Sequence, residues 1–228
     1  MDDLLTRQID YYRARAPEYD EWFERRGRYD QGPELNRTWF EEAAAVRSAL
    51  RDLGHVGDAL ELAGGTGIWT AELAGMAERV TVVDASPEMI AINRARVGSE
   101  RVRYVQADVF AWQPERAYDL VLFGFWLSHV PPERLDGFLE KVARATRPGG
   151  HLFVVDSRPD PTSTSADQPL PGADATTMTR RLNDGRSFTI VKIFYEPAAL
   201  AALLESHGFD ADARATEHYF VYASAGRR

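Results

Sequence analysis

Apolar residues occur along this chain in two patterns, short continuous runs and longer stretches with helical spacing. The continuous runs are 59–63, 80–84, 102–107, 118–125 and 151–156. The stretches with helical features are 68–77, 87–97 and 132–146. Runs of this length are typical of buried strands, and strands that alternate with helices predict a parallel sheet with right-handed crossovers. The pattern therefore indicates an open α/β fold.

The segments on either side of this core have their own patterns. Residues 3–26 have helical spacing that Pro17 interrupts, which predicts two short helices or a helix and a loop. A further helix is predicted at 35–53, where apolar residues fall on one face. The end of the chain predicts a helix at 197–207 and two closing strands at 210–216 and 218–224.

The stretch from Ser157 to Thr177 contains four prolines and few large apolar residues, so a long loop is predicted. It follows the fifth strand, at the edge where open α/β sheets bind ligands. Two interpretations remain open, a mobile lid over a site or a surface excursion. Beyond this loop, 178–182 and 186–195 flank Asn183-Asp184-Gly185, a turn signal that predicts a β-hairpin.

Composition narrows the classes of partner. A length of 228 residues suits one domain with a large core, and 35 acidic against 27 basic residues give a net charge of −8 that disfavours nucleic acid. No cysteine is present and the five histidines are scattered, so neither disulfides nor a metal site is predicted. No apolar stretch approaches the roughly 18 residues of a membrane span, and the first residues are acidic. We expect a cytoplasmic monomer or homodimer without membrane contact.

Residues 60–67, Leu-Glu-Leu-Ala-Gly-Gly-Thr-Gly, join an apolar strand directly to a glycine turn. Such a turn lets backbone N–H groups approach a ligand closely at the start of a helix. Asp84 ends the next apolar run, where a carboxylate can accept hydrogen bonds from a ribose diol. Glu61 and Asp84 are acids at the ends of buried strands, which is costly without a ligand or a donor. A site for a nucleoside cofactor is therefore predicted.

The residues that follow the glycine turn distinguish a dinucleotide from other nucleoside cofactors. A dinucleotide fingerprint would place a third glycine where this chain has Thr70. The segment instead resembles the first motif of class I S-adenosylmethionine-dependent methyltransferases. That family usually has glycine at the position of Ala63, a mild departure that we expect to tighten the turn without abolishing it. By this resemblance the cofactor is S-adenosylmethionine, contacted by Glu61, Ala63, Gly64, Gly65 and Gly67.

Later segments resemble the family's other motifs in the same order, so the resemblance spans about residues 35–225. They are 80–89, 102–108, 118–130 and 148–156. The resemblance implies a Rossmann-like, doubly wound seven-stranded sheet of order 3-2-1-4-5-7-6, with strand 7 antiparallel and helices on both faces. It also implies that Asp84 holds the ribose, Ala85 and Met89 lie against the adenine, and Asp108 accepts from its amine. Val109 and Gly124 are further cofactor contacts implied by the resemblance.

Candidates for the methyl acceptor side follow the fourth strand. His129 is the candidate catalytic base and substrate contact, because imidazole titrates near neutrality, although a packing role stays open. Phe125 and Trp126 can present ring faces to a substrate, or belong to the core. Two tyrosines of the N-terminal segment are also candidates: Tyr19 resembles a residue that closes over the cofactor, and Tyr11 is a weaker substrate contact. Arg180, Arg181 and Lys192 on the hairpin could bind a carboxylate or simply protect a sheet edge.

The predicted function is methyl transfer from S-adenosylmethionine to an oxygen or nitrogen of a small organic acceptor by in-line displacement. Two alternatives stay open, a nicotinamide-dependent oxidoreductase and a catalytically silent partner protein with a cofactor fold. The predicted single domain divides into an N-terminal helical cap, a cofactor-binding core, a lid loop with a hairpin, and a C-terminal helix with closing strands. Their bounds are 1–34, 35–156, 157–195 and 196–228.

Overall fold

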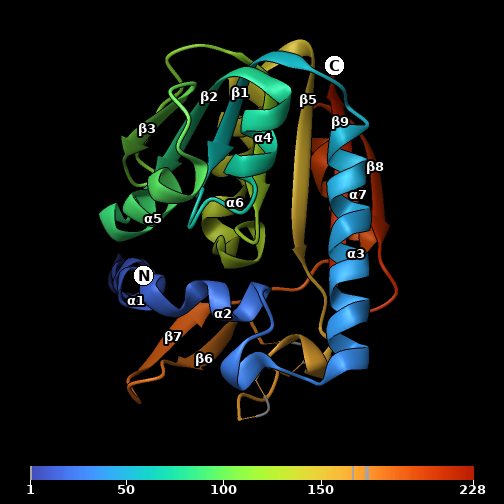
Figure 1. The fold of residues 1–228 in the computed structure, drawn as a ribbon. Helices are drawn as coiled ribbons and strands as arrows, with labels where there is room; N and C mark the ends of the chain where they lie inside the picture. The colour runs from blue at the N-terminus through green and yellow to red at the C-terminus, as the bar shows by residue number, and fades with distance from the viewer. Residues whose placement is uncertain (1, 166, 173–174) are drawn as a thin grey trace.

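A seven-stranded sheet forms the centre of the protein in a computed structural model that describes residues 2–165, 167–172 and 175–228 (Figure 1). The strand order is β3-β2-β1-β4-β5-β9-β8. β9 pairs antiparallel with both neighbours, and the other pairs of the sheet are parallel. With β8 and β9 counted as strands 6 and 7, this confirms the predicted order. The bounds are β1 Val56–Leu62, β2 Ala77–Asp84, β3 Val102–Gln106, β4 Tyr118–Gly124, β5 Thr146–Ser157, β8 Phe209–Ala215 and β9 Phe220–Arg227.

Helices cover both faces of this sheet. On one face, Phe138 and Leu139 of α6 and Leu204 of α7 enter a core with the apolar strand residues. On the other face, Trp39 of α3 and Leu73 of α4 enter a second core. The helix bounds are α1 Asp2–Arg15, α2 Tyr19–Phe23, α3 Pro33–Arg51, α4 Thr70–Met76, α5 Pro87–Val97, α6 Pro132–Ala145 and α7 Pro197–Ser206. Short 3-10 turns are η1 Ala16–Glu18, η2 Gly27–Tyr29, η3 Leu127–His129 and η4 Pro161–Ser163.

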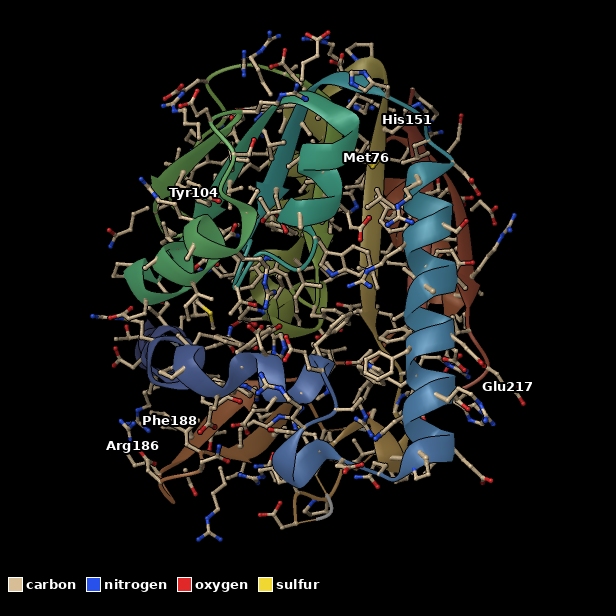
Figure 2. All side chains as sticks on the ribbon, viewed as in Figure 1. Met76, Tyr104, His151, Arg186, Phe188 and Glu217 are labelled. Carbon is tan, nitrogen blue, oxygen red and sulfur yellow. The ribbon has the colours of Figure 1, made fainter. Side chains whose placement is uncertain are left out.

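The predicted hairpin is present as a separate two-stranded sheet, β6 Thr177–Arg181 and β7 Ser187–Val191. The hairpin, which carries Phe188, packs beside α1 (Figure 2). The ring centroids of Phe188 and Tyr11 are 5.5 Å apart. The second strand is shorter than the predicted 186–195. Ile193 leaves the hairpin because its backbone N–H donates to Ser128 of η3. The hairpin is therefore tied to the segment that follows β4.

The loop that follows β5 is packed against the N-terminal segment rather than extended over the surface. Ser163, Thr164, Ser165 and Gln168 are buried. The indole of Trp22 donates to the carbonyl of Ser163 at 2.7 Å. These contacts join parts of the chain that lie far apart in the sequence. Separately, none of the helices in the described part of the chain is long and apolar enough to cross a membrane.

Candidate active site

The carboxyl ends of the parallel strands meet at one edge of the sheet, and α1, η1 and α2 lie across that edge (Figure 1). A pocket with about 740 Å³ of empty space lies between them, and we call it the edge pocket. Eleven residues predicted from the sequence line it: Tyr19, Ala63, Gly65, Asp84, Ala85, Met89, Asp108, Val109, Gly124, Phe125 and Trp126.

The glycine turn that follows β1 contains two kinds of glycine. A Cβ added to Gly64 would lie 2.3 Å from Val82 Cγ1, and one added to Gly67 would lie 2.7 Å from Asn93. These two glycines therefore allow close packing of the turn, and neither lines the edge pocket. Gly65 has a φ of 52° and no atom within 4 Å of an added Cβ, and it does line the pocket. Gly65 is the glycine that leaves room for a ligand.

Ala63 adopts a φ of 53°, in the left-handed region that favours glycine. The turn thus keeps a glycine-like backbone at the position where the chain has alanine. Phe125 is in the same region, with a φ of 54°. Both residues line the edge pocket, and strained backbone of this kind is concentrated at functional sites.

Asp84 links the end of β2 to the glycine turn. Its Oδ2 accepts from the Gly65 amide at 2.9 Å, and its Oδ1 accepts from the Ser86 amide at 2.8 Å. Burial raises the pKa of this carboxyl, against the backbone amides that lower it. Ala85 and Met89, which follow in the chain, line the same pocket. The geometry places a carboxylate beside the open glycine, as a site for a ribose requires.

Glu61 lies behind the turn rather than in the lining of the edge pocket. Its carboxyl accepts from the hydroxyl of Thr70, which also accepts from Asn93 Nδ2 at 2.7 Å. The side chain is 2% exposed, and burial raises its pKa to about 8. Cofactor contact by Glu61 stays a prediction. Asn93 was not predicted as part of the site, because a polar residue inside a helix gives no local signal that the fold brings it to the turn.

The segments that follow β3 and β4 complete the pocket. Asp108 accepts from the Phe110 amide at 2.9 Å, so it caps the turn that follows β3. Trp126 lines the pocket, and its buried indole Nε1 has no hydrogen-bond partner among the described residues. An unpaired buried donor is costly in a folded protein. A bound ligand that accepts from this nitrogen would remove that cost.

Polar contacts that the sequence did not reveal fasten the N-terminal helices beside the pocket. Gln8 Nε2 donates to the carbonyl of His129 at 3.0 Å, and Gln8 Oε1 accepts from the Val191 amide at 3.0 Å. Asp20 accepts from the Thr66 hydroxyl of the glycine turn at 2.6 Å and from Arg96 of α5 at 2.6 Å. Gln8 and Tyr19 line the edge pocket from this side. The cap and the glycine turn are therefore connected directly.

A second pocket lies beside the first, and we call it the cation pocket because Arg15, Arg180 and Lys192 line it. It holds about 380 Å³ of empty space. Tyr12, Tyr19 and Phe125 line both pockets. The cation pocket is also lined by Tyr11 and His129, which were predicted to contact the substrate, and by Ser157, the first residue of the predicted loop. Trp126, predicted to contact substrate, lines only the edge pocket.

His129 is buried in η3 with its ring in the cation pocket. Its Nδ1 lies 2.6 Å from the carbonyl of Val191, so Nδ1 carries the proton and the lone pair is on Nε2. Burial, together with the positive charge of Lys192, lowers the pKa of His129 to about 3. The ring is neutral at physiological pH. Within the described residues no group of three or more histidines, aspartates or glutamates could hold a metal ion.

Comparisons with known proteins agree with this geometry. A family model described as a methyltransferase domain matches residues 59–150. The structure of DhpI in complex with SAH is similar over 99% of this chain and 97% of that chain, with 38% identity and a TM-score of 0.79. The ubiquinone/menaquinone biosynthesis C-methyltransferase UbiE of Hydrogenovibrio crunogenus is 31% identical over 131 residues, which are 54% of this chain and 49% of that protein.

This chain spans about half the length of the curated relatives it matches. The N-methyltransferase NodS of Bradyrhizobium japonicum, in complex with S-adenosyl-L-homocysteine, shares the fold at 15% identity over 96% of this chain and 97% of that chain, with a TM-score of 0.67. The likeness to DhpI, in contrast, combines 38% identity with nearly complete coverage of both chains. With the predicted sheet order and the glycine turn in place, the chain belongs to the class I S-adenosylmethionine-dependent methyltransferases.

Proposed function

We propose that this protein transfers a methyl group from S-adenosylmethionine to a small organic acceptor. The observation that carries the proposal is the placement of Asp84 and Gly65 together in the lining of the edge pocket. A carboxylate beside a glycine with open space around it is suited to a nucleoside with a ribose diol. The neighbours DhpI and NodS, whose structures are described as complexes with SAH, support the same cofactor.

The residues present fit this cofactor. Asp84 would hold the ribose hydroxyls, Ala85 and Met89 would pack on the adenine, and Asp108 would accept from the adenine amine. Trp126 belongs to the same pocket, and its buried indole nitrogen has no partner among the described residues. When bound, S-adenosylmethionine supplies a methyl group activated by a sulfonium.

The chain's own contribution is to align the acceptor and to exclude water. Tyr12, Tyr19 and Phe125 line both pockets, so a molecule in the cation pocket would lie next to the edge pocket. Holding two reactants in line can supply about 7 to 11 kcal/mol of a barrier, so few reactive side chains are needed. Gln8 and Asp20 keep the cap in place over the site.

The role of His129 stays a prediction. The neutral ring offers Nε2 as an acceptor, and it lies in the cation pocket with the acceptor side of the site. A lowered pKa makes it a weak base. We therefore favour contact with the acceptor over proton abstraction, and transfer to an oxygen or nitrogen as predicted.

Mass spectrometry with methyl-labelled S-adenosylmethionine tests this function. The full chain is incubated with a panel of small acids, phenols and amines, and both the labelled product and S-adenosylhomocysteine are measured. We expect the label on one class of acceptor, with an equal yield of S-adenosylhomocysteine, and fragmentation identifies the methylated atom. The relative UbiE is named a C-methyltransferase, so fragmentation must also distinguish carbon. No transfer to any member of the panel, with turnover of a nicotinamide cofactor instead, would contradict the proposal.

A further inference from the structure

We propose that the methyl acceptor is an acid, whose oxyanion group is bound by Arg15, Arg180 and Lys192 in the cation pocket. The inference rests on the proposed function and names the class of substrate for the same site. It is carried by the charge balance of the pocket and by the partners of each cation.

Arg15 is a buried cation that lacks a carboxylate. It is 7% exposed, and its guanidinium donates to the hydroxyl of Tyr11 and, at 3.4 Å, to that of Tyr29. Its Nε is buried without any hydrogen-bond partner among the described residues. A buried charge is normally paired, because its desolvation is expensive. Within the described residues, Arg15 thus has one nitrogen without a partner and no counter-ion.

Arg180 also lacks a counter-ion among the described residues. It extends from β6 and donates to two neutral oxygens, Thr164 Oγ1 at 2.7 Å and Gln168 Oε1 at 3.2 Å. No ion pair in the described part of the chain includes Arg180 or Arg15. Burial lowers the pKa of Arg180, which indicates how poorly its charge is compensated.

Lys192 carries the third positive charge. Its Nζ donates to Ser128 Oγ at 2.8 Å, to Ser157 Oγ at 2.6 Å and to Asp156 Oδ1 at 3.3 Å. Among the described residues, Asp156 is the only carboxylate that pairs with any of these three cations, and its partner is Lys192. Burial raises the pKa of Tyr12, so its hydroxyl is neutral and adds no negative charge. Three cations face one carboxylate, and the pocket is electropositive.

A compact oxyanion fits this arrangement. Arginine donors recognise carboxylate and phosphate groups through several parallel hydrogen bonds, and these are strongest where water is excluded. Because Tyr12, Tyr19 and Phe125 line both pockets, a bound acid would lie next to the edge pocket, where the cofactor is proposed to bind. The anion is then part of the acceptor and orients it, whereas an amine would meet repulsion from the same residues.

Calorimetric titration with inorganic phosphate and, separately, with acetate tests the proposal on the full chain saturated with S-adenosylhomocysteine, at constant ionic strength. We expect at least one of the two probes to bind, and the preferred probe distinguishes a phosphate-type from a carboxylate acceptor. Arg180→Gln should lower the affinity for that probe by about tenfold or more and leave the affinity for S-adenosylhomocysteine unchanged. Arg180→Lys keeps the positive charge, so its affinity for the probe should fall less.

Arg181→Gln is the matched control, since the next residue of β6 is exposed and does not line the pocket. It should bind both ligands as the unmodified chain does. Binding of neither probe to the saturated protein, or equal losses in Arg180→Gln and Arg181→Gln, would overturn the inference. Failure to bind S-adenosylhomocysteine in the first place would instead count against the proposed function.

Discussion

The Gly65 amide donates a hydrogen bond to Asp84 Oδ2 at 2.9 Å. This contact joins the turn after β1 to the end of β2, at the point where the edge pocket opens. The same carboxylate also accepts from Ser86 at the start of α5. One side chain therefore shapes the turn and lines the pocket, which makes it the most informative position to change.

Replacing Asp84 by alanine should weaken the binding of S-adenosylhomocysteine by about 1.5 to 3 kcal/mol, the range for a charge-assisted hydrogen bond. Calorimetry gives the affinity, and thermal unfolding of the same variant reports the loss of the two backbone contacts. Asp84→Asn keeps one acceptor oxygen, so it should lie between the alanine variant and the unmodified chain. Unchanged affinity in Asp84→Ala would rule out the ribose role.

The glycines of the turn should respond differently to substitution. Gly65→Val places a branched side chain in the open space of the edge pocket and in left-handed backbone, so we expect affinity for the cofactor to collapse while the fold survives. Gly64→Ala should instead lower stability, because its Cβ would meet Val82 at 2.3 Å. Calorimetry and thermal unfolding of both variants separate the two effects. Normal ligand binding by Gly65→Val would show that the turn is not the site.

Glu61 should make the stability of the ligand-free protein depend on pH. Burial raises the pKa of Glu61 to about 8 in the folded protein, whereas the pKa in the unfolded chain is about 4.3. Between these two pH values the folded state binds one proton more than the unfolded state. Stability from this group is complete below the unfolded pKa and is lost as the pH rises through 8. Glu61→Gln cannot lose a proton, so it should gain stability relative to the unmodified chain as pH rises. Urea unfolding at about pH 5, 7 and 9 measures the difference, and a constant difference would contradict the raised pKa.

His129→Ala should reduce turnover by less than about tenfold, because a ring whose pKa lies at about 3 contributes little as a base. Affinity for S-adenosylhomocysteine should stay nearly unchanged, and KM for the acceptor should rise. The pH profile of the unmodified enzyme should lack an ionisation near the ordinary histidine value. A loss of about 10² to 10⁴ in turnover, with such an ionisation, would instead establish His129 as the general base.

Local sequence signals predicted the parts of the site that lie close to a strand end. The turn from Ala63 to Gly67 and the acid at Asp84 follow apolar runs, and each signal is complete within a few residues. The sheet order and the family were confirmed for the same reason, since the motifs occur in a fixed order. The division into cap, core, lid and closing strands stays a prediction.

Contacts between distant segments could not be predicted. Gln8 reaches His129 and Val191 only when α1 lies across the sheet edge. Likewise, Arg180 and Arg181 are neighbours with the same chemistry, and only the alternation of a strand places one in the pocket and the other outside. The loop at 157–177 is a further case. Of its described residues, only Ser157 lines either pocket, and the expected lid role stays a prediction.

Calorimetric titration of the full chain with S-adenosylhomocysteine, and separately with NAD, decides which cofactor the edge pocket binds. We expect one site for S-adenosylhomocysteine, loss of that binding in Gly65→Val, and no heat from NAD. Binding of NAD without binding of S-adenosylhomocysteine would contradict this expectation.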